Sequence, residues 1–310
     1  KKNADVIENF EVTDLLFEGG RVVGVKGTGK DKNEKTFNAK VVVGADGAGS
    51  IVASKLGLNN FEADRSLVAV RAYYENVEPV EGYIEFHFLE ELMPGYFWIF
   101  PVGDNEYNVG IAVVAEDVSK RKLNLKDKLN EITAKSRFSD RFRNAKQITD
   151  IKGWNLPTGA QKRKRAGDGF ILVGDAASLI DPFTGEGIGN ALTSGKLAAE
   201  TIADAIGKND FSYRSLGAYE EKINATFGNE FAASYKFQRF GKNPVMFNAL
   251  IETLSRDKNT MKIATSTFMK PKDKKATFKI PFRMYLRVLF RYISDVIKIK
   301  VSKNKHLGKV

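Results

Sequence analysis

The sequence of 310 residues contains no cysteine and only two histidines, His87 and His306. Disulfide bonds, thiolate catalysis and cysteine- or histidine-rich metal sites are therefore excluded, and we expect no metal site. No stretch reaches 18 consecutive apolar residues, which argues against a membrane-spanning helix. The amino terminus shows no secretory leader, and from this we expect a cytoplasmic location.

The formal net charge of +11 is concentrated at one end of the chain. Of the 49 basic and 38 acidic residues, residues 270–310 hold 13 and 2, which leaves 36 of each in the first 269 residues. A nucleic-acid enzyme would spread basic charge over its binding face, so the neutral body argues against a nucleic-acid partner. A basic tail indicates an anionic surface or a flexible arm instead.

The remaining composition, 43% hydrophobic and 28% charged, is typical of a folded globular protein. Alternation and turn residues predict strands over Phe10–Phe17, Arg21–Lys26, Thr36–Gly44, 66–76, 82–89, 95–101, 106–115, 147–154 and Phe170–Val173. Helices are expected over Ser50–Leu56, 123–143, from Gly187 to Ile206, over most of 213–268, and over 282–300.

Residues 169–199 contain the strongest ligand-binding pattern. A buried strand delivers Gly174 and Asp175 at its carboxyl end, where α/β folds bind ligands, and Asp175 would accept hydrogen bonds from a sugar or polyol. The turn from Pro182 through Gly185 and Gly187 leads into a helix at Ile188, so that free backbone amides would face negative charge. The alternative is a strand–helix turn without a ligand.

Two further segments have both a binding and a structural interpretation. The apolar run 41–43 ends at Gly44-Ala45-Asp46-Gly47, where Asp46 lies beside a ligand or caps the next helix. In the segment 94–101, alternation places three aromatic side chains on one strand face, ending at Pro101: Tyr96, Trp98 and Phe100. They form either an apolar wall for a ligand or a sheet face packed against a helix.

These three motifs, in this order, resemble FAD-dependent oxidoreductases of the aromatic-hydroxylase superfamily, and especially the geranylgeranyl reductase family. The resemblance implies that Asp175 holds the ribityl chain of FAD and that Gly187 and Ile188 contact the isoalloxazine. The same cofactor site would include Asp46, Gly47, Gly174, Pro182 and Gly185. Tyr96, Trp98, Phe100 and Pro101 would line a lipid pocket. Ala53 replaces the arginine that usually follows the Asp-Gly segment, which weakens a pyridine-nucleotide role.

The resemblance implies an α/β (α+β) fold: an FAD-binding Rossmann-like domain, an antiparallel-sheet substrate domain and a helical carboxyl-terminal region. No GxGxxG loop opens a helix, so we expect a copy lacking the first βαβ unit. The expected segments are 1–64 and 161–210 in the FAD-binding domain, 65–160 in the substrate domain, 211–269 as a helical region, and 270–310 as a basic amphipathic tail.

The implied reaction is hydride transfer from reduced FAD to a carbon–carbon double bond of an isoprenoid lipid. The electron donor, NAD(P)H or a ferredoxin-like protein, stays open. A flavin-dependent monooxygenase or epoxidase is the alternative, and a non-catalytic lipid-binding protein at a membrane surface is the second alternative. His87 is either a proton donor or a packed side chain.

Two basic segments have open interpretations. In 281–301 apolar residues recur at helical spacing beside Arg283, Arg287 and Arg291, which suits an anionic membrane surface or a helix docked on the protein. Lys162-Arg163-Lys164-Arg165 either contacts a phosphate or forms a solvated loop. Together with the predicted lipid substrate, the tail suggests an enzyme peripheral to the inner face of the membrane.

Overall fold

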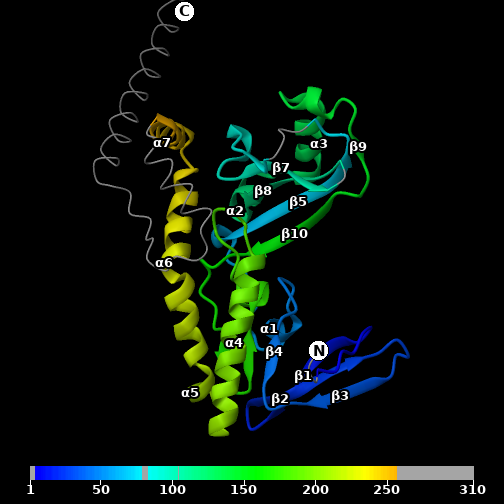
Figure 1. The fold of residues 1–310 in the computed structure, drawn as a ribbon, viewed down its shortest axis with the longest axis vertical. Coiled ribbons are helices and arrows are strands. Elements are labelled where there is room, and N and C mark those ends of the chain that lie inside the picture. The colour runs from blue at the N-terminus through cyan, green and yellow to red at the C-terminus, as the bar shows by residue number, and fades with distance from the viewer. Residues whose placement is uncertain (1–3, 79–82, 104, 257–310) are drawn as a thin grey trace, which may run out of the picture. The chain divides into compact units, whose positions relative to one another are not determined.

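The computed structural model describes residues 4–78, 83–103 and 105–256, which divide into two units that each combine separate stretches of chain (Figure 1). Among the described residues, the first unit joins those up to Val68 with Trp154–Phe231, and the second joins Ala69–Gly153 with residues 232–256. The predicted segments 1–64 and 161–210 fall in the first unit, and most of 65–160 falls in the second.

The first unit begins with an antiparallel sheet in the order β1-β2-β3, formed by β1 (Glu11–Glu18), β2 (Arg21–Thr28) and β3 (Glu34–Asn38). Gly19 and Gly20, with φ of 55° and 84°, form the tight turn between β1 and β2. Two consecutive residues with positive φ match the twist of a hairpin, which explains why glycine occupies both positions. The two predicted strands of this hairpin are confirmed.

A second, three-stranded sheet has the order β11-β12-β4, formed by β4 (Val42–Gly44), β11 (Ala166–Gly167) and β12 (Phe170–Leu172). β12 runs parallel to β4 and antiparallel to β11. The single strand predicted over Thr36–Gly44 is therefore wrong, because its two ends pair in different sheets. The polar residues of β3 stay exposed beside β2, whereas Val42 is buried beside β12.

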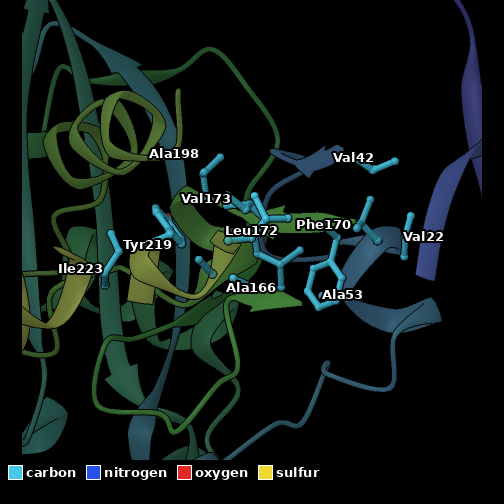
Figure 2. Packing of buried hydrophobic residues seen from close by; sticks show 14 of the residues in the cluster. Val22, Val42, Ala53, Ala166, Phe170, Leu172, Val173, Ala198, Tyr219 and Ile223 are labelled. Atoms are coloured by element: carbon cyan, nitrogen blue, oxygen red, sulfur yellow. The ribbon is translucent and has the colours of Figure 1, made fainter. Parts of the chain in front are cut away.

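Helical elements complete the core of the first unit, to which all of those named next except η1 contribute buried residues. They are α1 (Ile51–Lys55), η1 (Ala63–Arg65), η4 (Gly174–Ala177), α4 (Ile188–Lys208), α5 (Tyr213–Leu216) and α6 (Ala218–Phe240), which continues into the second unit. Figure 2 shows Leu172 in the middle of this core, with Ala198 of α4 and Tyr219 and Ile223 of α6 on one side and Phe170, Ala53 and Val42 on the other. This core fixes the carboxyl ends of β4 and β12.

The second unit is built on a six-stranded sheet in the order β10-β5-β8-β7-β6, with β9 paired to β5. Its strands are β5 (Ser66–Glu75), β6 (Glu85–His87), β7 (Tyr96–Gly103), β8 (Glu106–Val114), β9 (Lys146–Gln147) and β10 (Lys152–Pro157). β6, β7 and β8 pair in antiparallel fashion, as predicted. The strand predicted over 147–154 is instead two short strands, because Tyr73 donates its amide to the Thr149 side chain between them.

The helical elements of the second unit are η2 (Glu90–Leu92), α2 (Ala115–Arg121), α3 (Leu125–Lys135), η3 (Ser139–Phe142) and α7 (Pro244–Arg256). The helix predicted over 123–143 is confirmed as α3 and is followed by the 3₁₀ turn η3. The helix expected over 282–300 and the basic tail lie outside the described residues. None of the described helices combines the length and the apolar composition needed to cross a membrane.

Candidate functional site

The two glycine-aspartate motifs of the first unit lie side by side. Because β4 and β12 are parallel, their carboxyl ends meet at one edge of the sheet, and the Val173 amide donates to the Gly44 carbonyl at 2.9 Å. The turn after β4 contains Asp46 and Gly47, and the turn after β12 contains Gly174 and Asp175. The structure thus brings together two segments that are far apart in the sequence, at the edge where such sheets bind ligands.

In the first of these turns, Asp46 has a structural role. Its Oδ2 accepts a hydrogen bond from the Val52 amide at 3.1 Å, and Ser50 Oγ accepts from the Ala53 amide at 2.9 Å. These bonds satisfy amides of the first turn of α1, as the capping interpretation predicts. Ala53 is fully buried, so the core leaves no room there for an arginine side chain. The cofactor role of Asp46 stays a prediction.

The second turn positions a half-buried carboxylate. Gly174 has φ of 56°, and its amide donates to Ser194 Oγ of α4 at 3.0 Å. Among the described residues, none donates a hydrogen bond to the Asp175 carboxylate, and burial raises its pKa. Such a group is costly to bury without a partner, so it suits a ligand that supplies hydroxyl donors.

Gly187, at the amino end of α4, allows the helix to approach Asp175 closely. A Cβ atom at Gly187 would lie 3.3 Å from Asp175 Oδ1 and would occupy the space beside the carboxylate. The next residue, Ile188, is 81% exposed, and Leu192, one helical turn later, is 73% exposed. An open apolar surface therefore lies next to an unpartnered acceptor, an arrangement that fits a ligand with both a planar ring and a polyol chain.

The turn between η4 and α4 is held by two acidic side chains that the sequence analysis did not identify. The buried Asp181 accepts hydrogen bonds through Oδ1 from the amides of Phe183 and Thr184 at 2.9 and 2.8 Å. Glu186 Oε1 accepts from the Gly189 amide at 2.9 Å and so caps α4. An aspartate at the start of a turn often accepts a hydrogen bond from the backbone amide two residues later, in an Asx-turn. This local preference could have identified Asp181 from the sequence.

The hydrogen bond from the Gly189 amide to Glu186 reduces the number of free amides at the start of α4. The positive end of α4 was predicted to face a negatively charged ligand through free amides, but the Gly189 amide is already bonded to a carboxylate. Gly185, with φ of 72°, shapes the turn, and its amide donates to the Asp181 carbonyl. The predicted contribution of this helix to ligand binding is therefore limited to its first residues, Gly187 and Ile188.

The aromatic motif lies in the second unit, and its three rings share one face of β7, as alternation predicts. The Tyr96 and Trp98 centroids are 5.9 Å apart, as are those of Trp98 and Phe100. Phe86 of β6 contacts both ends of the row, at 5.2 Å from Tyr96 and 5.0 Å from Phe100. Five rings share this face once Phe88, 6.2 Å from Tyr96, is included.

This aromatic face is only partly open. Tyr96 and Trp98 are buried, and Phe88 packs against Phe247 of α7 at 5.0 Å, so helix packing covers the Tyr96 end. Phe86 is 40% exposed, and Phe100 is partly exposed at the other end of the row. Pro101 is exposed too, but it follows Phe100 directly and so lies on the opposite face of β7. Gly110 of β8 lies beneath the indole, where a Cβ would come within 2.4 Å of a Trp98 ring carbon. The Tyr96 end is thus a sheet face packed against a helix, whereas the Phe100 end is open enough to be an apolar wall for a ligand.

His87 occupies the opposite face of β6 from Phe86. Its Nε2 lies 3.0 Å from Glu85 Oε2, and its ring packs against Phe138 at 4.6 Å. Arg141 pairs with Glu85 through two hydrogen bonds of 2.6 and 2.8 Å. His87 is therefore a packed side chain that points away from the aromatic face, which argues against a proton-donor role there.

A family model described as the FAD binding domain matches residues 1–224. The digeranylgeranylglycerophospholipid reductase of Methanocella arvoryzae is 32% identical over 242 residues, which are 77% of this chain and 59% of the relative. The enzyme of the same name from Thermoplasma volcanium is 33% identical over 234 residues, which are 73% of this chain and 56% of the relative. The chain thus spans little more than half the length of these relatives.

Solved structures show the same fold. A geranylgeranyl bacteriochlorophyll reductase-like protein from Thermoplasma acidophilum has a TM-score of 0.68 and 24% identity, covering 93% of this chain and 68% of its own. A flavin-dependent brominase has a TM-score of 0.65 and 19% identity, covering 94% of this chain and 70% of its own. At these identities the likeness establishes the architecture, and the α/β fold expected from the sequence is confirmed.

Proposed function

The chain belongs to the FAD binding domain family, and on this basis we propose that it acts in an FAD-dependent reductase that saturates carbon–carbon double bonds of an isoprenoid lipid. The substrate class follows from the names of the relatives, which are digeranylgeranylglycerophospholipid reductases. The structural observation that supports the proposal most directly is the half-buried, unpartnered Asp175 carboxylate beside Gly187 and the exposed Ile188.

The residues of the first unit have distinct tasks in this proposal. Asp175 would accept hydrogen bonds from the ribityl hydroxyl groups, and the missing side chain of Gly187 would leave room for that chain beside the carboxylate. Ile188 offers its exposed side chain to the flavin ring, while Asp181 and Glu186 hold the turn between them. FAD, when bound, supplies the hydride for the reduction, and a proton completes the saturation of the double bond.

In the second unit, the aromatic face provides the apolar surface for the lipid. Phe86 and Phe100 form its accessible part, and an isoprenoid chain there would bury apolar area without losing hydrogen bonds. The buried indole of Trp98 is fixed by a hydrogen bond from Nε1 to Asn108 Oδ1 at 2.9 Å. Because its polar atom is satisfied, Trp98 presents only its apolar ring to this face.

The proposal is tested by adding FAD to the purified chain, recording the visible spectrum, and incubating the complex without oxygen with dithionite and a digeranylgeranylglycerophospholipid. Mass spectrometry is expected to show two added hydrogens per reduced double bond, and none with Asp175→Ala. Oxygen uptake coupled to NADPH with insertion of oxygen into the product would favour the monooxygenase alternative. A chain without any flavin uptake would favour the non-catalytic alternative.

We also propose that the basic tail, residues 270–310, holds the enzyme at the anionic inner face of a membrane. The support is the charge division, because these residues have 13 basic and 2 acidic side chains whereas the rest of the chain is neutral. Each basic residue near an anionic bilayer contributes about 1 kcal/mol to binding. The tail would thus bring the enzyme to the surface that contains its lipid substrate.

A further inference from the structure

The segment Lys162-Arg163-Lys164-Arg165 alternates between exposed and buried side chains. Lys162 and Lys164 are exposed, whereas Arg163 and Arg165 are only 8% and 9% exposed. The solvated-loop interpretation of this segment is therefore wrong for both arginines, since their guanidinium groups lie inside the first unit. Arginine is rarely buried to this extent without a specific partner.

Both arginines bind the turn that follows β12. Arg163 Nη1 donates to the Ala176 carbonyl at 3.0 Å, and its Nη2 donates to Asn59 Oδ1 and the Asn60 carbonyl, each at 3.3 Å. Arg165 Nε donates to the Ala177 carbonyl at 3.0 Å. Ala176 and Ala177 directly follow Asp175, so the two arginines contact the turn from the protein side.

Neither guanidinium group forms an ion pair with a carboxylate among the described residues. Glu62 pairs instead with Arg65, and Glu220 accepts from the Arg165 backbone amide at 2.6 Å. Arginine stays charged at any accessible pH. Each buried guanidinium group is held directly by neutral oxygen acceptors, while the carboxylates of Glu62 and Glu220 act on Arg163 and Arg165, respectively, without an ion pair. Positive charge in a low-dielectric interior stabilises a nearby anion more strongly than the same charge in water.

The other contacts of this turn complete its positioning. Ser194 Oγ accepts from the Gly174 amide at 3.0 Å on the α4 side, and Asn190 Nδ2 donates to the Leu179 carbonyl at 2.8 Å. The arginines bind the carbonyls between these two contacts. The position of Asp175 is therefore set by backbone groups on both sides of it, and the arginines are the only charged groups among these contacts.

We propose that Arg163 and Arg165 are positioning residues of the flavin site: they fix the turn that presents Asp175, and their buried positive charge favours the reduced, negatively charged flavin over the oxidised one. The inference rests on the proposed function, because it requires FAD beside Asp175. It assigns to this basic segment a role that does not require contact with phosphate.

The test compares Arg163→Met and Arg165→Met, which remove the charge, with Arg163→Lys and Arg165→Lys, which keep it. Lys162→Met and Lys164→Met are the matched controls, since they remove an exposed charge from the same segment. Circular dichroism and thermal melting check that each variant folds. FAD affinity is measured by fluorescence titration, and the two-electron potential of the bound flavin is measured by anaerobic redox titration.

We expect both methionine variants to weaken FAD binding at least tenfold and to lower the potential. A tenfold larger loss of affinity for reduced than for oxidised flavin corresponds to a potential lower by about 30 mV. The lysine variants should weaken FAD binding but keep the potential closer to that of the wild type, a difference that a merely structural role would not produce. If the methionine variants do not fold, Arg163→Gln and Arg165→Gln, which remove the charge but keep a hydrogen-bond donor, take their place in the comparison with the lysine variants.

Folded arginine variants with wild-type affinity and potential would overturn the inference, as would equal changes in the Lys162 and Lys164 controls. A wild-type chain that takes up no FAD would overturn the proposed function and the inference with it. Flavin uptake that is insensitive to Arg163 and Arg165 would overturn the inference alone.

Discussion

Asp175 illustrates, at the scale of one residue, how a binding site costs stability. Its carboxylate is half-buried with no hydrogen-bond donor among the described residues, and burial raises its pKa above the usual 3.8. The folded chain therefore binds this proton more tightly than the unfolded chain does, and the ionised group destabilises the fold. A ligand that donates hydrogen bonds to it would remove that cost.

The substitution Asp175→Asn separates the two effects. Without FAD, we expect the variant to melt at a higher temperature than the wild type at pH 7. The difference should disappear at pH values below 3.8, where the carboxyl group is protonated in both states. FAD affinity should fall roughly tenfold or more, because a hydrogen bond to a charged group contributes about 1.5–3 kcal/mol. Equal melting temperatures at pH 7 would contradict this account.

Gly110 is a second residue whose substitution has a predictable effect on the stability of the fold. A Cβ there would lie 2.4 Å from both the Trp98 ring and the Val70 carbonyl oxygen, so Gly110→Ala should destabilise the fold by about 1–3 kcal/mol. The background Trp154→Phe leaves Trp98 as the single tryptophan, since the sequence has two. We expect its fluorescence to shift to longer wavelength as the indole moves from its buried position.

The control for this change is Gly228→Ala in α6. A Cβ at Gly228 would have no atom within 4 Å, so the variant should gain about 0.5–1 kcal/mol from helix propensity. It should leave the Trp98 emission unchanged. A Gly110→Ala protein with wild-type stability and emission would show that the indole does not depend on the space beneath it.

The sequence predicts some site residues and not others, for physical reasons. Gly174 and Asp175 stand at the end of an apolar run, so both their place at a strand end and the acceptor chemistry are local properties. Nothing in the local sequence distinguishes the buried Arg163 and Arg165 from the exposed Lys162 and Lys164. The burial of the arginines depends on the carbonyl groups of Ala176 and Ala177, which belong to a later turn. Ser194 has no local signal, because its partner, the Gly174 amide, is reached only through tertiary packing.

At the scale of elements, the two faces of β6 lie in different environments, one aromatic and one partly charged. Phe86 faces the aromatic row, while Glu85 and His87 face Phe138 and Arg141 on the other side. Burial lowers the pKa of His87 below its usual 6.5, although the neighbouring Glu85 opposes this change. The neutral imidazole is therefore favoured in the folded chain.

The lowered pKa of His87 predicts how the stability of the fold depends on pH. Because the unfolded chain binds the proton first, stability should fall as the pH drops below 6.5 and should level off once it passes the lower folded pKa. His87→Gln should remove this part of the pH dependence. With only two histidines in the chain, an NMR titration compared with that variant identifies the His87 signal. A titration midpoint above 6.5 would contradict the prediction.

Elements were predicted where a repeating pattern was long and unbroken. The alternation in β7 and β8 and the helical spacing in α4 were sufficient, because each of these elements buries one continuous face. The strand over Thr36–Gly44 was wrong because extended residues do not reveal which sheet they join. β3 and β4 are separated by only a few residues, yet they pair with β2 and β12 respectively.

At the scale of the whole molecule, the division of charge leads to a prediction about the tail. Deleting residues 271–310 should abolish binding to liposomes with anionic headgroups and leave FAD uptake unchanged. Neutral liposomes should bind neither form, and added salt should release the full chain, since the attraction is screened within about 10 Å at 0.1 M. Liposome binding that survives the deletion would show that the tail is not the anchor.

The order of the chain through the two units has a consequence for synthesis. β4 cannot pair with β12 until the intervening residues from Ala45 to Gly169, which include most of the second unit, have left the ribosome. At 5–20 residues per second this takes roughly 6–25 s. During this interval β4 lacks its pairing strand, so we expect the first unit to need protection from aggregation on the nascent chain, while the six-stranded sheet of the second unit can already form.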